Sequence, residues 1–124
     1  MRKHILLVED QALLRKLYAE VFSEAGYTVT QAEDGKSALE ALEQCRPDII
    51  VTDIRLPWVS GVHFINQVRT QRETAHLPIV ALSGGGDEYL ERANACGATV
   101  SLPKSADFNR LLGVVEQALT ARPC

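Results

Sequence analysis

The sequence lacks the features that mark exported, membrane-spanning or metal-cluster proteins. Its 124 residues include only three cysteines, which are widely spaced and form no C-x-x-C pair, so neither a zinc site nor a disulfide framework is expected. No apolar run approaches the roughly 20 residues needed to cross a bilayer. The first apolar run begins almost at once, with no leader pattern before it. We therefore expect a soluble, cytoplasmic protein with reduced thiols and no membrane partner.

An excess of positive charge is also missing. Thirteen basic and 16 acidic side chains give a formal net charge of -3, so the chain has no general cationic field to attract nucleic acid. There is no low-complexity linker and no internal repeat. A chain of 124 residues with 46% hydrophobic content can bury one sizeable core. We expect residues 1–124 to form a single domain that makes no direct contact with nucleic acid.

Five apolar runs of strand length alternate with segments of helical period. Three runs, at residues 4–9, 48–53 and 78–83, are continuous in Ile, Val and Leu, as expected for strands covered on both faces. Two runs, at residues 27–32 and 99–102, are more polar and suit the edges of a sheet. The alternation predicts an α/β fold, a doubly wound parallel sheet of (βα)5 type with strand order 2-1-3-4-5.

Helices are expected between these strands. Three of them are predicted near residues 35–45, 61–71 and 87–96. Two others have a clear apolar face. The first face comprises Leu14, Leu17, Tyr18, Val21, Phe22 and Ala25, and the last comprises Phe108, Leu111, Leu112, Val115, Ala118 and Leu119. Gly26 and Gly97 each stand between a helix and a strand, where a residue with positive φ ends a helix at little cost.

Polar side chains follow the expected strands at the points where they end. Glu9 and Asp10 end the first strand, Asp53 ends the third, Ser83 ends the fourth and Lys104 follows the fifth. In a doubly wound sheet the binding crevice lies outside the carboxyl ends of the strands, here between the first and the third. We therefore expect three acids, a hydroxyl and an ammonium to converge there.

This combination of groups favours phosphoryl chemistry. Three adjacent carboxylates repel one another unless a cation lies among them, and hard oxygen ligands suit Mg²⁺. A phosphoryl group could then approach Asp53 while Lys104 and Ser83 bind its oxygens, which makes Asp53 a candidate nucleophile that forms an acyl phosphate. Each residue alone is more often a cap, a turn residue or a solvated charge. The ordered set is what favours a reactive site.

This ordered set resembles the receiver domain of two-component response regulators, over essentially the whole chain. Glu9 and Asp10 match the acidic pair of the family, Asp53 its phosphoacceptor, Ser83 its Ser/Thr and Lys104 its lysine. The stretch D-I-R-L-P-W-V-S-G matches the family pattern Asp-x-x-x-Pro-x-x-x-Gly. The resemblance implies a flavodoxin-like fold, Mg²⁺ as cofactor, and phosphoryl transfer to Asp53 from a histidine kinase or a phosphotransfer protein.

The resemblance also implies roles for the residues around the phosphoacceptor. The implied metal ligands are Glu9, Asp10, Asp53 and the backbone carbonyl of Arg55. Arg55 and Gly85, two residues after Asp53 and Ser83, occupy positions that tune the lifetime of the acyl phosphate. Ser83 and Ser101 occupy the switch positions. The implied output is a change in the face formed by the fourth helix, the fifth strand and the fifth helix, which binds a downstream protein of unknown identity; homodimerisation stays open.

The chain departs from the family pattern near its last strand. The family usually has Pro directly after the lysine, whereas here Ser105 follows Lys104 and Pro103 precedes it. Ser105 is a candidate N-cap for the last helix. At the position of Ser101 the family commonly carries a Tyr or Phe that turns inward when the Ser/Thr moves. Without a ring there, we expect weaker or different coupling between Asp53 and the output face.

Other functions stay open on the sequence alone. A constitutive interaction module with a vestigial pocket is favoured by Ser101 and the absent Pro, and opposed by the retained acids. An aspartyl-phosphate hydrolase would usually need a second acid and a substrate cap, but Ile54 and Arg55 follow Asp53. A flavin-binding protein would need hydroxyls or glycines where this chain has acids. We expect a phosphoacceptor that assists its own phosphorylation and dephosphorylation, and not a turnover enzyme.

Overall fold

One parallel sheet organises the molecule. The computed structural model describes residues 2–54, 61–84, 97–104 and 106–120. The strands are β1 (His4–Val8), β2 (Thr28–Ala32), β3 (Ile49–Asp53), β4 (Ile79–Ser83) and β5 (Val100–Pro103). They lie in the order β2-β1-β3-β4-β5, and each neighbouring pair is parallel. The predicted fold class and strand order are confirmed.

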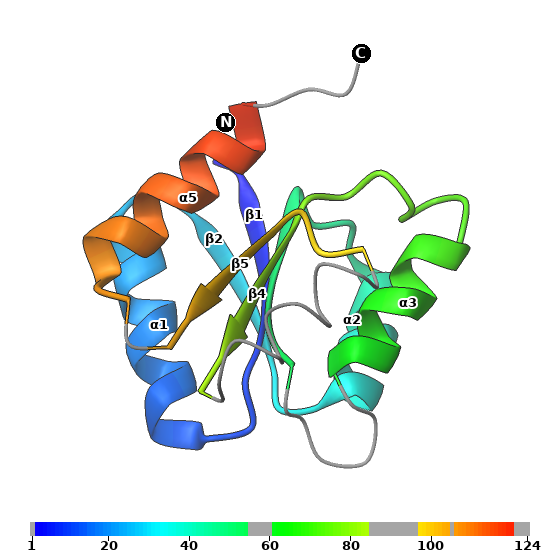
Figure 1. Ribbon diagram of the computed structural model, residues 1–124, viewed down its shortest axis with the longest axis horizontal. Coiled ribbons are helices and arrows are strands. Elements are labelled where there is room, and N and C mark those ends of the chain that lie inside the picture. Colours follow the sequence, from blue (N-terminus) through cyan, green and yellow to red (C-terminus); the bar gives the residue numbers. More distant parts are fainter. Residues whose placement is uncertain (1, 55–60, 85–96, 105, 121–124) are drawn as a thin grey trace.

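Helices cover both faces of this sheet. The described helices are α1 (Ala12–Glu24), α2 (Gly35–Gln44), α3 (Gly61–Thr70) and α5 (Phe108–Thr120). In Figure 1, α1 and α5 lie on one side of the sheet, and α2 and α3 lie on the other. None of the described helices has the length and apolar character needed to cross a membrane. The helix expected near residues 87–96 lies outside the described residues.

The sheet divides the core into two layers. Every residue of β3 and β4 is buried, whereas most of β2 is exposed or half-buried, so the predicted division into central and edge strands is confirmed. Successive side chains of a strand point to opposite faces. Ile50 accordingly packs with Phe64 of α3, while its neighbour Val51 packs with Phe22 of α1 and Val115 of α5.

The buried face of α1 differs in part from the predicted one. Tyr18 and Phe22 are buried as expected, and Ala19 joins them. Leu17 is 43% exposed and Ala25 is exposed, so these two residues of the predicted apolar face are not part of the buried one. The buried stripe follows one line along the helix, and Leu17 lies to the side of it. Ala25 follows the last residue of α1 and does not belong to the helical face at all.

The helix ends explain two further outcomes. Gly26 and Gly97 have φ values of 99° and 118°, which confirms the prediction that each adopts a positive φ. The expected N-cap at Ser105 was wrong, because α5 begins only at Phe108. The carboxylate of Asp107 accepts the backbone N–H of Arg110 at 2.7 Å, the bond that an N-cap residue makes. Ser105 itself lies outside the described residues.

Candidate functional site

Three carboxylates meet at the carboxyl ends of β1 and β3. Oxygen atoms of Glu9, Asp10 and Asp53 all lie within 4.8 Å of one another. The strand register explains this proximity. Val8 pairs with Thr52, so the residues that follow them, Glu9 and Asp53, are neighbours. Glu9 and Asp53 are almost completely buried, at 1% and 3% exposure, while Asp10 is exposed. Two acids are thus buried at the base of the site, and the third is exposed at its rim.

Lys104 extends from the end of β5 to both buried acids. Its Nζ lies 2.7 Å from Glu9 Oε1 and 2.7 Å from Asp53 Oδ2. Its backbone N–H donates to the carbonyl oxygen of Ser83 at 2.8 Å, as follows from the pairing of Ser83 with Pro103. Lys104 therefore joins the ends of four strands, through its backbone to β4 and through its ammonium to the acids that follow β1 and end β3.

The charges at this site shift one another's protonation. Burial raises the pKa of Glu9, although the contact with Lys104 opposes the rise. For Lys104, burial disfavours the charged form, but its hydrogen bonds to Asp53 and Glu9 outweigh that cost and raise the pKa of the ammonium. Lys104 consequently stays charged at neutral pH and neutralises one of the three carboxylates.

The donor set fits a divalent cation. Three ionised carboxylates and one ammonium leave two negative charges uncompensated, and carboxylate oxygens are the ligands that Mg²⁺ prefers. Two of the acids are fixed by strand ends, while exposed Asp10 leaves the rim open to water and to an incoming group. We conclude that Glu9, Asp10 and Asp53 are suited to hold Mg²⁺ beside Lys104.

The remaining predicted site residues lie at different depths. Ser83 is buried, at 1% exposure, and ends β4 beside Leu82, the residue that pairs with Asp53. Ser101 is half-buried and pairs with Ala81 further back along the sheet. Arg55 and Gly85, which were expected to tune the site, lie outside the described residues. Ser83 thus ends its strand close to Asp53, whereas Ser101 pairs with a residue two positions before Ser83 along β4.

Two residues at the start of α1, the N-cap residue Gln11 and Arg15 within the helix, support Glu9 and were missed by the sequence reasoning. The backbone N–H of Gln11 donates to Glu9 Oε2 at 3.1 Å. The Arg15 guanidinium donates to the backbone carbonyl of Glu9 at 2.9 Å. These contacts fix the side chain and the backbone of the acid. Arg15 could have been noticed from its position, because a residue one turn into a helix can reach back to the loop that precedes it.

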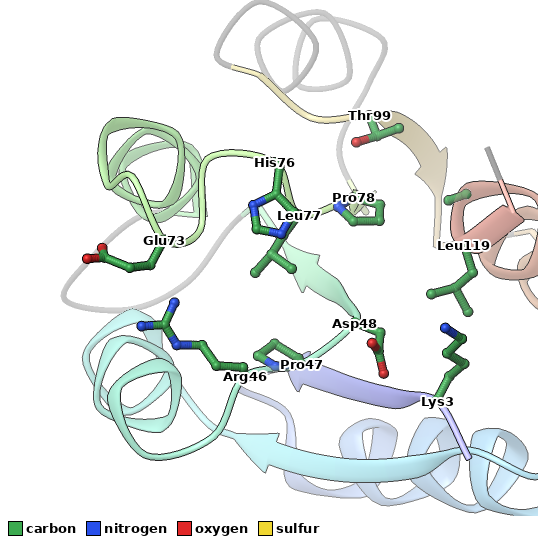
Figure 2. Close-up of a pocket in the computed structure, with 11 residues that line it drawn as sticks. Lys3, Arg46, Pro47, Asp48, Glu73, His76, Leu77, Pro78, Thr99 and Leu119 are labelled. Carbon is green, nitrogen blue, oxygen red and sulfur yellow. The ribbon is translucent and has the colours of Figure 1, made fainter. Parts of the chain in front are cut away.

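A broad groove of about 1070 Å³ lies at the opposite, amino-terminal end of the sheet. Figure 2 shows Lys3 and Arg46 lining it together with Asp48 and Glu73. Asp48 is already engaged, since its Oδ2 accepts the backbone N–H of His4 at 2.7 Å. Two basic and two acidic side chains compensate one another there. The groove therefore does not select ions of either sign, and the acidic cluster is the better candidate for chemistry.

Many known proteins are similar to this chain in sequence or in fold. The family model described as the response regulator receiver domain matches residues 5–116. The polar-differentiation response regulator DivK of Brucella anthropi is 34% identical over 108 residues, which is 85% of this chain and 88% of that protein. The chemotaxis response regulator CheY4 of Vibrio cholerae superposes with a TM-score of 0.88 at 29% identity, over 95% of this chain and 99% of CheY4.

A third relative was solved with a metal. The receiver domain of a sensor histidine kinase from Pseudomonas aeruginosa has a TM-score of 0.89 and 28% identity, over 98% of this chain and 100% of that one. Its structure is described as having a magnesium ion coordinated in the active-site cleft.

Proposed function

The chain belongs to the response regulator receiver family, whose members are signalling domains, and on that premise we propose that Asp53 is its phosphoacceptor. The observation that carries this proposal is the position of the Asp53 carboxylate. It ends the central strand β3, lies within 4.8 Å of two other acids, and has an ammonium 2.7 Å away. A carboxylate placed between other acids and a fixed cation can approach a phosphoryl group as a nucleophile.

The reaction is transfer of a phosphoryl group from a phosphohistidine. A carboxylate oxygen of Asp53 forms a new bond to phosphorus, and the bond between phosphorus and the imidazole nitrogen breaks. The electron pair of that bond returns to the imidazole, which takes up a proton. The product is an acyl phosphate on Asp53. Lys104 is the residue that would balance the charge of the transferred group, and the Ser83 hydroxyl is a candidate donor to another of its oxygens.

Glu9, Asp10 and Asp53, with the backbone carbonyl of Arg55, are the proposed ligands of Mg²⁺. When bound, the cation would neutralise charge on the phosphoryl oxygens and allow them to approach an acidic site. Gln11 and Arg15 hold Glu9 in place through their hydrogen bonds. The start of α1 would therefore help to orient the proposed metal ligands, in addition to the packing of α1 on the sheet.

We further propose that residues 1–124 act as one receiver domain. A histidine kinase or a phosphotransfer protein would supply the phosphoryl group, and the output would be a change in binding to a downstream protein through the face that includes β5 and α5. Arg55 and Gly85 are proposed to tune the lifetime of the acyl phosphate, and Ser83 and Ser101 to relay the change.

The decisive experiment is intact-mass analysis after incubation with acetyl phosphate and Mg²⁺. We expect one phosphoryl adduct that depends on Mg²⁺ and that is absent in Asp53→Asn. Asp48→Asn is the matched control, because Asp48 is an acid that immediately precedes β3, at the end of the sheet opposite Asp53, and it should keep the adduct.

Two results would contradict the proposal. The first is an adduct that survives Asp53→Asn, and the second is the absence of any Mg²⁺-dependent adduct. Repeated turnover of a phosphoester by the wild-type protein would instead indicate a hydrolase.

A further inference from the structure

Arg69, near the end of α3, connects three separate segments of the chain. Its Nε donates to the carbonyl oxygen of Gly97 at 2.9 Å. One terminal nitrogen, Nη1, donates to the carbonyl oxygens of Ala75 at 3.0 Å and Leu77 at 2.6 Å. The other, Nη2, donates to Thr99 Oγ1 at 3.3 Å. We call this set of contacts the Arg69 clamp. It joins the end of α3 to the segment that enters β4 and to the segment that enters β5.

The clamp holds β5 where the sheet holds it least. β5 is only four residues long and lies at the edge of the sheet, where β4 is its one partner among the described strands (Figure 1). Thr99 immediately precedes it, and its hydroxyl also accepts the backbone N–H of Ile79 at 3.0 Å. In Figure 2, Thr99 and Leu77 lie on the two neighbouring segments that the guanidinium joins. The entry to β5 is therefore fixed by side-chain contacts in addition to the ladder.

Gly97 allows the guanidinium stem to approach this closely. A Cβ atom at position 97 would lie 2.9 Å from Arg69 Cγ, a separation at which one of the two must move. Gly26 provides a natural comparison. It has a similar positive φ of 99°, but a Cβ atom there would meet nothing within 4 Å. Substitution of either glycine strains the backbone, and only substitution of Gly97 also displaces the clamp.

From these contacts we infer that Arg69 is a positioning residue for Lys104. Thr99 and Lys104 are five residues apart, roughly 16 Å along an extended strand, and the short β5 between them is a stiff connection. Holding Gly97 and Thr99 fixes where β5 begins, and this in turn fixes where Lys104 reaches Glu9 and Asp53. Arg suits this role because its planar fork donates to several acceptors at once, which a lysine ammonium cannot do in the same geometry.

The test compares Arg69→Met and Gly97→Ala with Gly26→Ala. The part of this inference that concerns the rate of adduct formation rests on the proposed function, so two readouts are needed. The first is the set of backbone amide resonances of Val100, Ser101, Leu102 and Lys104 in the unphosphorylated protein. The second is the rate of adduct formation with acetyl phosphate, measured at a temperature where all variants are folded. We expect Arg69→Met and Gly97→Ala to shift these resonances and to slow the adduct about tenfold, less than the ~100-fold that a 1 Å misplacement can cost. Gly26→Ala should change neither.

A double mutant separates positioning from a general loss of order. If Arg69 acts through Lys104, Arg69→Met should slow the reaction of Lys104→Ala by less than twofold, because the group it positions is already gone. Slowing by the same factor in both backgrounds would overturn the inference, as would unchanged amide resonances at these four residues. Failure of the wild-type protein to form any adduct would refute the proposed function, while the resonance comparison would still decide the role of the clamp.

Discussion

Single carboxylates at helix starts carry a measurable part of the stability, and Asp34 is the clearest case. Its side chain accepts the backbone N–H of Ser37 at 2.7 Å and caps α2. That hydrogen bond lowers the pKa of Asp34 below its ordinary value of 3.8. Because the folded-state pKa lies below the unfolded one, the contribution of the cap is complete above the unfolded pKa and is lost as the pH falls through the folded value.

We therefore predict that Asp34→Ala lowers the free energy of unfolding by about 1 kcal/mol at pH 7. The difference from wild type should shrink as the pH drops below about 4. Urea denaturation across this pH range measures both effects. Asp34→Asn is the control, since an amide oxygen can still accept the bond but does not titrate there. If the difference in unfolding free energy between wild type and Asp34→Ala stays constant down to pH 3, the cap does not depend on ionisation of Asp34.

Lys104 has a stabilising role at the residue scale that is separate from any chemistry. Removing its ammonium leaves two buried acids without a cation. We predict that Lys104→Ala lowers the free energy of unfolding by about 2 kcal/mol in metal-free buffer, less than the roughly 3–5 kcal/mol for breaking a fully buried ion pair, because the Lys104 side chain is partly exposed. Saturating Mg²⁺ should narrow the gap to wild type, since a bound cation would supply the missing charge.

Chemical denaturation with and without a chelator tests this prediction. Lys16→Ala, at an exposed position of α1, is a suitable control and should change stability by no more than about 0.5 kcal/mol. Equal effects of Lys104→Ala in the presence and absence of Mg²⁺ would argue against a cation at the acidic cluster.

At the scale of the elements, α1 contributes through a narrow stripe. Phe22 is completely buried and Leu17 is 43% exposed, although both are large apolar residues of the same helix. We predict that Phe22→Ala costs about 3–5 kcal/mol of unfolding free energy because it leaves a cavity in the layer shared with α5. Leu17→Ala should cost about 0.5 kcal/mol or less. Thermal or urea unfolding of the two variants measures both losses of stability. Comparable losses for Phe22→Ala and Leu17→Ala would mean that α1 packs differently.

The elements also show which parts of the molecule the sequence could predict. Continuous apolar runs predicted β1, β3 and β4, because a strand with both faces covered has no room for polar side chains. The meeting of Glu9 with Asp53 followed from strand order alone. The clamp at Arg69 could not be predicted in this way, because three of its four acceptors are backbone carbonyls. Every residue carries a carbonyl, so only the folded geometry says which one a guanidinium will reach.

Helix starts illustrate the same limit over a shorter range. Ser105 and Asp107 are both common N-cap residues, and the sequence does not say where the helical turn begins. The structure begins α5 at Phe108, so that Asp107 is in position to cap it. A shift of two residues in a helix boundary was enough to change the residue that makes the bond.

At the scale of the whole molecule, the open question is how a change at Asp53 reaches α5. Ser101 stands where the resemblance leads one to expect a ring, on the strand between the acidic site and that helix. We predict weaker or different coupling than in receivers with a Tyr or Phe there. Relaxation-dispersion NMR with and without the acyl phosphate tests this coupling. We expect only a small change in the conformational exchange of β5 and α5 when the acyl phosphate forms. Ser101→Tyr, which restores the ring, should increase that response; a large response already present in the wild type would contradict the prediction.

The two-layered core also determines how the backbone opens to solvent. Amides of β3 and β4 are covered on both faces and paired on both sides, so water reaches them only when the whole domain unfolds. Within the described part of the chain, the edge strands β2 and β5 each pair on one side, and both are partly exposed. Native-state hydrogen exchange should therefore divide the sheet into a slow centre and two fast borders. Lys104 follows β5, one of the two strands expected to exchange fast. The acids that it binds lie at the ends of the central strands β1 and β3, so each local opening of β5 would briefly separate these acids from their cation.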